Sequence, residues 1–316
     1  MPERVLITGA TGFVGSHIAE AFAEAGYEVR CGARDPNHPR WLADLPVELV
    51  PLDLDHPADL LPALQSVDTV IHAAGITRAR RPEDYERVNA VGTRRLAAAA
   101  RGSGVRRFVF ISSLAARGPD GMDRPTSAYG WSKRRAEAHV YALLGDMETT
   151  ILRPAAVYGP RDTDLLPLFE MAKRGWLVLP SGPGLLQPVY AADVAAAALL
   201  AARGSYAGAG PFSVAEPASY SWEQVVRLME KVMGHRIRAL RLPAGAFALG
   251  GRIAERAAKL GGSAPSFDVR RAEDLAARAW TCDVSVTEEA LGWRSEVPLR
   301  EGLDLTARWY EKNGWT

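Results

Sequence analysis

The sequence predicts an α/β fold in which helices cover both faces of an open, doubly wound parallel sheet. Short apolar runs rich in β-branched residues recur along the first half of the chain, and longer stretches with helical periodicity separate them. A glycine-rich turn follows the first of these runs. Strands that are buried on both faces and alternate with helices form mostly parallel sheets.

Length and composition are those of an ordinary globular protein. The 316 residues suffice for a large core and two lobes, and 47% of them are hydrophobic while 24% are charged. The formal net charge is +1, from 38 basic and 37 acidic residues, so the overall charge gives no reason to expect nucleic acid or an anionic membrane as a partner. Any charged ligand must be held locally.

The cysteines and the hydropathy pattern argue against a disulfide-bonded, zinc-binding, secreted or membrane-spanning protein. Cys31 and Cys282 are far apart and lack the spacing of a disulfide framework or a zinc site, so we expect no metal. The N-terminus runs directly into an apolar segment without a signal-peptide pattern. The longest alanine-rich apolar stretch, 194–202, is too short to span a bilayer. We therefore expect a cytoplasmic protein with no membrane span.

The first apolar run, Val5 to Thr8, leads into a turn with glycines three residues apart, and a helical pattern follows from 16 to 25. This order forms a phosphate cradle, because glycines let the backbone approach a pyrophosphate and the helix N-terminus offers unpaired N–H groups. The spacing departs from G-x-G-x-x-G, but the flanking elements are those the cradle requires. We predict a dinucleotide site formed by Gly9, Thr11, Gly12, Phe13, Val14 and Gly15.

The end of the second predicted strand, 28–33, indicates which dinucleotide binds. In NAD-type sites an acidic residue near this strand end binds the ribose hydroxyls, but here Ala33 is followed by Arg34. A guanidinium pairs well with a 2′-phosphate, so the sequence favours NADP(H). NAD(H) stays open because Asp35 comes next.

Further strands are expected at 47–52, 67–72, 105–111 and 149–154. Asp53, followed by Leu54, lies at a strand end from which it can reach an adenine amino group. Ala73, Ala74 and Gly75 follow the next strand, and their small size would let a flat cofactor lie against the backbone. We interpret His72, just before them, as structural.

A phenol and an ammonium lie four residues apart at Tyr129 and Lys133, where a helix begins after a loop rich in Gly, Pro and Asp. At this spacing both side chains project from one helical face, so the cation favours the ionised phenol and makes Tyr129 a usable acid and base. Chance explains many such pairs. Here the strand at 105–111 also delivers Ser113 to the sheet edge that holds the glycine turn, which favours a functional site.

The regular alternation ends near residue 160. Helices are expected at 165–175, 221–234, 243–260, 284–291 and 299–313, while a strand end and a helix return at 189–202. We predict a dinucleotide-binding domain formed by 1–160 and 188–204, and a smaller, mostly helical substrate lobe formed by 161–187 and 205–316.

Taken together, these motifs resemble the extended short-chain dehydrogenase/reductase family. The resemblance covers nearly the whole chain and rests on segments 8–15, 53–54, 72–75, 85–93, 111–113, 129–133, 152–154 and 158–160, with a closing segment at 291–293 and 302–310. It implies a Rossmann sheet, a catalytic set of Ser113, Tyr129 and Lys133, and a cofactor contact from Pro154. Asn89 would be either a proton relay or a structural helix contact.

The resemblance also implies roles. Tyr129 would exchange a proton with a carbonyl or alcohol oxygen, Lys133 would lower the pKa of Tyr129 and bind the nicotinamide ribose, and Ser113 would hydrogen-bond the reacting oxygen. Family members often dimerise through helices that correspond to 82–102 and 128–144, so we expect a homodimer that acts on a small molecule.

Two branches of the family stay open. Nucleotide-sugar enzymes commonly place an Arg seven residues before the aspartate that corresponds to Asp193; here Leu186 stands there, although Arg161 is a possible substitute. The acidic residue beside the catalytic Ser of the dehydratases is also absent. We therefore favour a ketone reductase or secondary-alcohol dehydrogenase of a largely apolar substrate, similar to dihydroflavonol reductases and 3β-hydroxysteroid dehydrogenases. The alternatives are an NDP-sugar epimerase or dehydratase, and a dinucleotide-binding protein without turnover.

Overall fold

The structure is a computed structural model of the chain, and it describes residues 2–182, 184–204, 210–243, 246 and 279–316. The helix expected at 243–260 lies almost entirely outside the described residues. Within them, no helix is both long enough and apolar enough to cross a bilayer.

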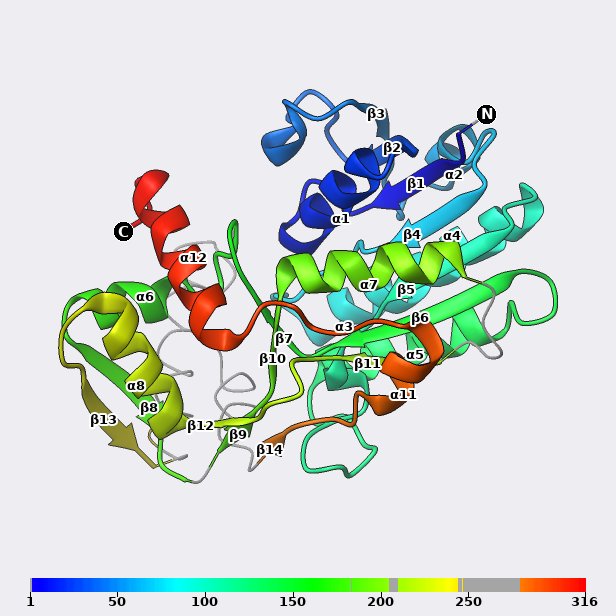
Figure 1. Cartoon of the computed structure of the whole chain (residues 1–316). Coiled ribbons are helices and arrows are strands. Elements are labelled where there is room, and N and C mark those ends of the chain that lie inside the picture. Colours follow the sequence, from blue (N-terminus) through cyan, green and yellow to red (C-terminus); the bar gives the residue numbers. More distant parts are fainter. Residues whose placement is uncertain (1, 183, 205–209, 244–245, 247–278) are drawn as a thin grey trace.

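Seven parallel strands form the main sheet in the order β11-β6-β5-β4-β1-β2-β3 (Figure 1). The direction in which strands are added reverses between β1 and β4, and in open α/β sheets ligands bind at the carboxyl ends of the strands at such a point. The strands are β1 (Arg4–Thr8), β2 (Glu28–Ala33), β3 (Val47–Pro51), β4 (Thr69–His72), β5 (Arg107–Ile111), β6 (Glu148–Pro154) and β11 (Phe212–Val214). The predicted doubly wound α/β class is confirmed.

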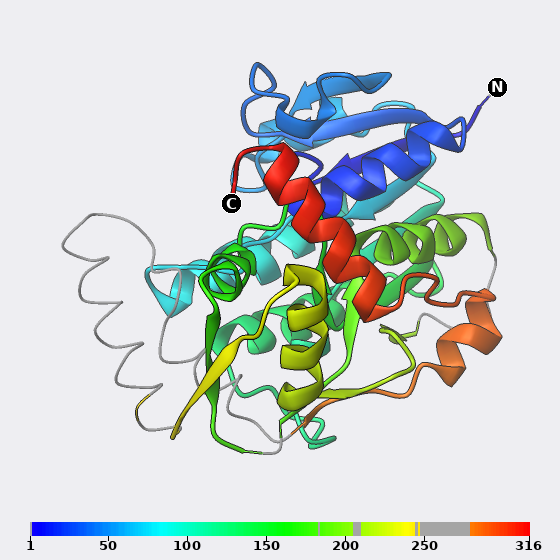
Figure 2. The same ribbon diagram turned by 60° about the vertical axis from the view of Figure 1, so that its left-hand side comes forward.

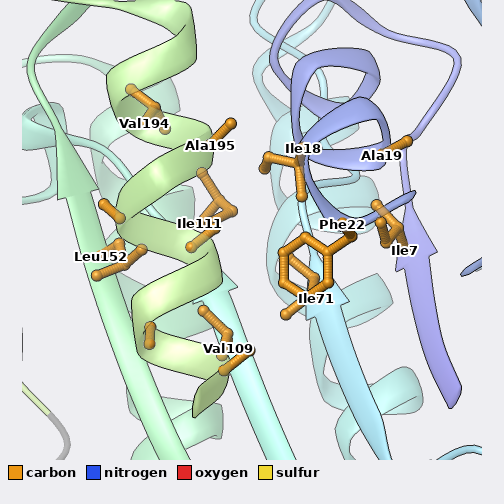
Figure 3. Packing of buried hydrophobic residues seen from close by; sticks show 14 of the residues in the cluster. Ile7, Ile18, Ala19, Phe22, Ile71, Val109, Ile111, Leu152, Val194 and Ala195 are labelled. Atoms are coloured by element: carbon orange, nitrogen blue, oxygen red, sulfur yellow. The ribbon is translucent and has the colours of Figure 1, made fainter. Parts of the chain in front are cut away.

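Helices cover both faces of the sheet because successive side chains of a strand point to opposite sides. Val109 of β5 belongs to the cluster under α1 (Phe13–Glu24) and α7 (Ala191–Arg203), as Figure 3 shows. Its neighbours Phe108 and Phe110 belong to the cluster on the other face, beneath α4 (Gly92–Gly102) and α5 (Ala128–Tyr141). The short α2 (Pro57–Ala63) completes that second layer.

The strand β11 was not predicted. It pairs with β6, and its residues Phe212 and Val214 are buried against the main core, although they lie in the range predicted for the second lobe. Helix α11 (Ser285–Leu291) and the buried Trp293 add to the same core. A three-residue strand is too short to show a period of two, so the pattern gave no signal for it.

A second core lies beside the sheet and contains Phe169 and Tyr310, whose ring centroids are 5.0 Å apart. Its helices are α6 (Leu166–Lys173), α8 (Trp222–Met233) and α12 (Leu299–Lys312), and Figure 2 shows α8 and α12 side by side. They pack with β8 (Trp176–Pro180) and β13 (Arg238–Leu242), which form a two-stranded parallel sheet. The smaller strands are β7 (Ala156–Tyr158), β9 (Leu185–Leu186), β10 (Pro188–Tyr190), β12 (Tyr220–Ser221) and β14 (Ala279–Trp280).

Asp193, in the first turn of α7, ties the two cores together. Its carboxylate accepts hydrogen bonds from the Ser295 hydroxyl at 2.8 Å and from the backbone N–H groups of Glu296 and Val297 at 3.2 Å. Its carbonyl oxygen accepts the indole N–H of Trp293 at 2.9 Å. These bonds fix the segment that leads into α12 against the helix that covers the main sheet.

Candidate active site

The turn after β1 requires glycine at Gly9 and at Gly15, where a Cβ atom would collide with the backbone. Gly9 has φ +72°, and a Cβ there would lie 2.7 Å from the backbone of Ala74 at the end of β4. A Cβ on Gly15 would lie 2.1 Å from the carbonyl oxygen of Gly9. Gly12 caps α1 without a side-chain hydrogen bond, and the first turn of α1 has no acidic residue. The N-terminus of α1 therefore keeps backbone N–H groups and a positive dipole end for a phosphate.

The other predicted cofactor residues border this cradle or follow neighbouring strands. Thr11, Phe13 and Val14 are half-buried in the turn. Arg34 is exposed immediately after β2, and Asp53 is half-buried just after β3, where its carboxylate accepts the N–H of Asp55 at 2.9 Å. The remaining members are half-buried at the end of β4 (Ala73, Ala74), exposed beside it (Gly75), or buried (Leu54, Pro154).

Helix α5, whose first turn carries Tyr129, packs against the segment that follows Ser113. The Ser127 hydroxyl caps α5 by accepting the N–H of Gly130. A Cβ on Gly130 would lie 2.4 Å from the carbonyl oxygen of Ala115, so this glycine permits the close approach of the first turn of α5 to that loop. The Ser113 oxygen accepts the N–H of Ala115 at 3.2 Å, which leaves the hydroxyl hydrogen available to a ligand.

The Lys133 side chain is buried, and its Nζ donates a hydrogen bond of 2.7 Å to the carbonyl oxygen of Ile111 at the end of β5. The ammonium also lies 4.6 Å from the centroid of the Phe110 ring. Burial lowers the pKa of Lys133 to about 8, and the nearby Glu137 carboxylate opposes this effect. A Cβ on Gly75 would lie 3.7 Å from this Nζ, so Lys133 reaches the carboxyl ends of both β4 and β5.

Asn89 lies in a π-helical segment, η2 (Glu86–Val91), between α3 (Pro82–Tyr85) and α4, within the range 82–102 where the family resemblance implied a helix. Its side chain is buried and brackets the backbone of Ile76, accepting the N–H at 2.8 Å and donating to the carbonyl oxygen at 3.0 Å. It also donates to the Ser132 hydroxyl oxygen at 3.0 Å. These contacts join the segment of Asn89 to Ile76 and to α5.

His72, interpreted from the sequence as structural, links the glycine turn to the helix of Asn89. Its Nδ1 is 2.7 Å from the Thr8 hydroxyl and its Nε2 is 2.8 Å from the Thr93 hydroxyl. Because Thr93 donates to the Asn89 carbonyl oxygen, we assign the ring proton to Nε2. Burial, together with the nearby Lys133 charge, lowers the pKa of His72 to about 3, so the ring stays neutral.

A buried ion pair, which the sequence reasoning missed, lies behind Ser113. The Glu137 carboxylate accepts two hydrogen bonds from Arg153, at 2.8 and 2.6 Å, and one from the Ser112 hydroxyl at 2.6 Å. Glu137 follows Lys133 by four residues on α5, a spacing that places both on one helical face and was the available signal.

The two positions weighed as a diphosphate clamp are both engaged elsewhere. Leu186 pairs with Tyr220 in a small sheet and packs against the second core. Arg161 forms an ion pair of 2.9 Å with Glu20 of α1 and lies over the Trp41 ring at 5.8 Å. Among the described residues, no group of His, Cys, Asp and Glu is arranged to hold a metal ion.

Comparisons with known proteins agree with this geometry. Residues 5–215 match the model of the NAD dependent epimerase/dehydratase family. The chain is 37% identical over 314 residues to a ceramide reductase of Caulobacter vibrioides (strain NA1000 / CB15N), which covers 98% of this chain and 95% of that one.

Two solved structures share the fold over almost the full length. The crystal structure of gox2253 has a TM-score of 0.79 and 26% identity, and the alignment covers 99% of each chain. MoeE5 in complex with UDP-glucuronic acid and NAD has a TM-score of 0.75 and 27% identity over 98% of this chain and 99% of that one. The chain belongs to the NAD dependent epimerase/dehydratase family, as an NAD(P)-dependent oxidoreductase of the extended short-chain dehydrogenase/reductase type.

Proposed function

We propose that this enzyme is an NADP(H)-preferring reductase of a ketone, or dehydrogenase of the matching secondary alcohol, on a largely apolar small molecule. The observation that carries the proposal is the approach of Lys133 to the ends of β4 and β5, beside the glycine cradle. The first turn of α5, which carries Tyr129, packs against the segment that follows Ser113. The carboxyl ends of its strands are where an open α/β sheet binds its ligand.

The turn of Gly9, Gly12 and Gly15 would hold a pyrophosphate, because the N-terminus of α1 offers backbone N–H groups that no side chain caps. Arg34 would pair with a 2′-phosphate, and Asp53 would reach the adenine. When bound, the nicotinamide supplies or accepts the hydride.

The proton would move at the phenol oxygen of Tyr129, which donates it to a carbonyl oxygen during reduction and takes it from an alcohol during oxidation. The Lys133 ammonium would stabilise the phenolate by its charge. Ser113 would donate its remaining hydroxyl hydrogen to the reacting oxygen, where negative charge develops. We assign Asn89 a positioning role, since both N–H donors of its amide are engaged, by the Ile76 carbonyl oxygen and the Ser132 hydroxyl oxygen.

Two observations support an apolar substrate. The positions that would hold a sugar diphosphate are occupied by Leu186 and by Arg161, which is already paired with Glu20. The similarity to a ceramide reductase extends over 98% of the chain. A cytoplasmic location and the homodimer expected from the family resemblance are parts of the proposal.

The central test measures NADPH oxidation with steroid-like, flavonoid-like and long-chain ketones. Tyr129→Phe should abolish turnover, while Tyr141→Phe, on the same helix, should retain it because its hydroxyl binds the Gly210 carbonyl oxygen away from the site. Failure of all apolar ketones, or turnover by Tyr129→Phe, would count against the proposal.

Cofactor preference is tested at Arg34. Charge-assisted hydrogen bonds contribute about 1.5–3 kcal/mol, so Arg34→Ser should weaken NADPH binding by about tenfold or more and leave NADH binding unchanged. Equal loss for both cofactors would contradict a 2′-phosphate contact.

One observation favours a second candidate, an NDP-sugar epimerase or dehydratase. MoeE5, solved with UDP-glucuronic acid and NAD, is 27% identical over 98% of the chain. An epimerase returns the hydride to the same substrate, so its cofactor stays bound. Cofactor that survives dialysis, together with a rise in Tm on adding UDP-sugars, would favour this candidate over the reductase.

A further inference from the structure

Positive charge gathers on one small part of the second lobe, although the chain as a whole is nearly neutral. Segments 173–180 and 231–242 together contain six basic residues and no acidic one, whereas the net charge of the whole chain is +1. The six are Lys173, Arg174, Lys231, Arg236, Arg238 and Arg241, and all are exposed. The two segments include β8 and β13, which pair along their full length.

Exposed apolar side chains lie among these charges. Trp176 of β8 is 45% exposed and stands in register with Arg238, while Leu240 of β13 is 51% exposed and stands in register with Val178. The alternate residues of β8, Leu177 and Leu179, are buried in the second core, so Trp176 points to the outer side of the sheet.

These residues surround one hollow rather than being scattered. A depression of about 540 Å³ is lined by Arg174, Gly175, Trp176, Arg238, Ala239 and Leu240. The N–H of Arg238 donates to the Gly175 carbonyl oxygen at 2.9 Å, which holds Arg174 and Arg238 on either side of Trp176. We call this surface the β8–β13 face; it lies at the end of the second lobe that is distant from the main sheet (Figures 1 and 2).

Most of the cations on this face are not neutralised by neighbours. Arg241 forms an ion pair with Glu223. Within the described part of the chain, no ion pair engages Lys173, Arg174, Arg236 or Arg238. The face therefore presents positive charge around a tryptophan and a leucine, a combination that suits the headgroup region of a membrane that contains anionic lipid.

We propose that the β8–β13 face docks the protein onto anionic membrane surfaces. The cations bind lipid phosphates, and Trp176 and Leu240 enter the boundary between headgroups and acyl chains. A nucleic acid fits less well, because an exposed leucine gains nothing from a phosphate backbone. Charges that protect a sheet edge from aggregation would explain Arg238 on β13, but not the exposed apolar side chains of Trp176 and Leu240.

This inference does not depend on the proposed reaction. Docking brings the enzyme to the phase in which apolar substrates partition, so it complements an apolar-substrate reductase. Vesicle binding is nevertheless measured without cofactor or substrate. A failed turnover assay leaves the docking result intact, and a failed docking assay leaves the turnover result intact.

The experiment is co-sedimentation of the full chain with sucrose-loaded vesicles of phosphatidylglycerol and phosphatidylcholine, compared with vesicles of phosphatidylcholine alone. We expect binding to the anionic vesicles that weakens as salt is raised. The double variant Arg174→Gln/Arg238→Gln should bind about 25-fold more weakly, since each cation near an anionic surface contributes about fivefold. Trp176→Ser should lose about tenfold.

Matched controls lie on other surfaces. Arg203→Gln/Arg300→Gln removes the same net charge from exposed positions, and Val286→Ser removes a side chain that is 58% exposed. Both should bind as the unmodified protein does, and Tm values should show that every variant is folded. Equal weakening by the arginine control, equal binding to neutral vesicles, or binding to DNA or RNA oligomers in place of vesicles would overturn the proposal.

Discussion

The Lys133 ammonium donates a hydrogen bond of 2.7 Å to the Ile111 carbonyl oxygen, so the helix that bears Tyr129 is joined to the strand that leads to Ser113. The bond replaces only part of the hydration that the ammonium loses when it is buried. The chain therefore holds an incompletely solvated ammonium at the site where we propose proton transfer. Its burial should affect both the free energy of unfolding and the way that free energy depends on pH.

Replacing Lys133 should abolish activity and raise the free energy of unfolding. Its pKa falls from 10.5 to about 8 on burial, which corresponds to a cost of about 3 kcal/mol below pH 8, offset in part by about 1 kcal/mol from the hydrogen bond to Ile111. Lys133→Met should therefore abolish turnover and raise the free energy of unfolding at pH 7 by about 2 kcal/mol. Urea denaturation and NADPH oxidation measure the two effects.

The sign of the pH dependence provides a stricter test. Between pH 8 and 10.5 the native Lys133 has lost its proton while the unfolded chain keeps it, so the unmodified protein gains stability relative to Lys133→Met as pH rises through this range. For the control variant Lys312→Met, at an exposed position, the stability difference from the unmodified protein should not change over this pH range. A stability difference that stays constant from pH 7 to 10 would refute the buried charge.

His72 should make the protein sensitive to acid. Its pKa falls from 6.5 to about 3 because the ring is buried, so between these values the unfolded chain binds a proton that the native ring does not. Stability should therefore decrease by up to about 1.4 kcal/mol for each pH unit below 6.5. His72→Phe should flatten this part of the curve.

The same variant should be less stable at pH 7, by about 1–3 kcal/mol, because the hydroxyls of Thr8 and Thr93 lose their shared partner. Exposed His235→Gln is the control and should follow the unmodified curve. Chemical denaturation between pH 4 and 8 measures both effects. If His72→Phe loses stability in acid as steeply as the unmodified protein, the buried His72 is not the cause of the acid sensitivity.

Removing only one charge of the Glu137–Arg153 ion pair should strongly lower the free energy of unfolding. Glu137→Gln leaves the Arg153 guanidinium buried without its counter-ion, and we expect a loss of about 3–5 kcal/mol. The double variant Glu137→Gln/Arg153→Met should recover much of this loss because it removes the unpaired charge. If the double variant is the less stable of the two, the pair does not act as we describe.

The pair should also affect the pH profile of the reaction. The Glu137 charge raises the pKa of Lys133, so its removal should move the alkaline limit of activity to lower pH. Exposed Glu148→Gln, which pairs with Arg107 away from the site, is the matched control. An unchanged alkaline limit in Glu137→Gln would show that Lys133 does not control the profile.

The proposed homodimer predicts a role for Trp131. This side chain is 42% exposed on α5, one of the helices through which we expect dimerisation. Trp131→Glu should shift the mass measured by light scattering from dimer to monomer, because an interface that buries a carboxylate without a partner loses its stability. Leu305→Glu, at a position 40% exposed on α12, should leave the mass unchanged. If the unmodified protein is a monomer by light scattering, the proposed homodimer is wrong.

The sequence predicted the order of the main elements well because buried parallel strands and amphipathic helices leave strong periodic patterns. It failed where the signal is short or set by neighbours. The three residues of β11 are too few to show a period, and the π-helical turn at Asn89 coincides with a hydrogen bond from the Thr93 hydroxyl to the Asn89 carbonyl oxygen within the helix. The helix expected at 243–260 lies almost entirely outside the described residues.

The sequence by itself determined the doubly wound sheet, the glycine cradle and the spacing of Tyr129 and Lys133, since each follows from local pattern and from the geometry of one element. Only the tertiary structure decided the partners of the buried polar groups. Lys133 meets Ile111, His72 bridges Thr8 and Thr93, and Glu137 meets Arg153, because the sheet brings together segments that are distant in the chain. Burial then sets the pKa values of Lys133 and His72, and burial is a property of the packed fold.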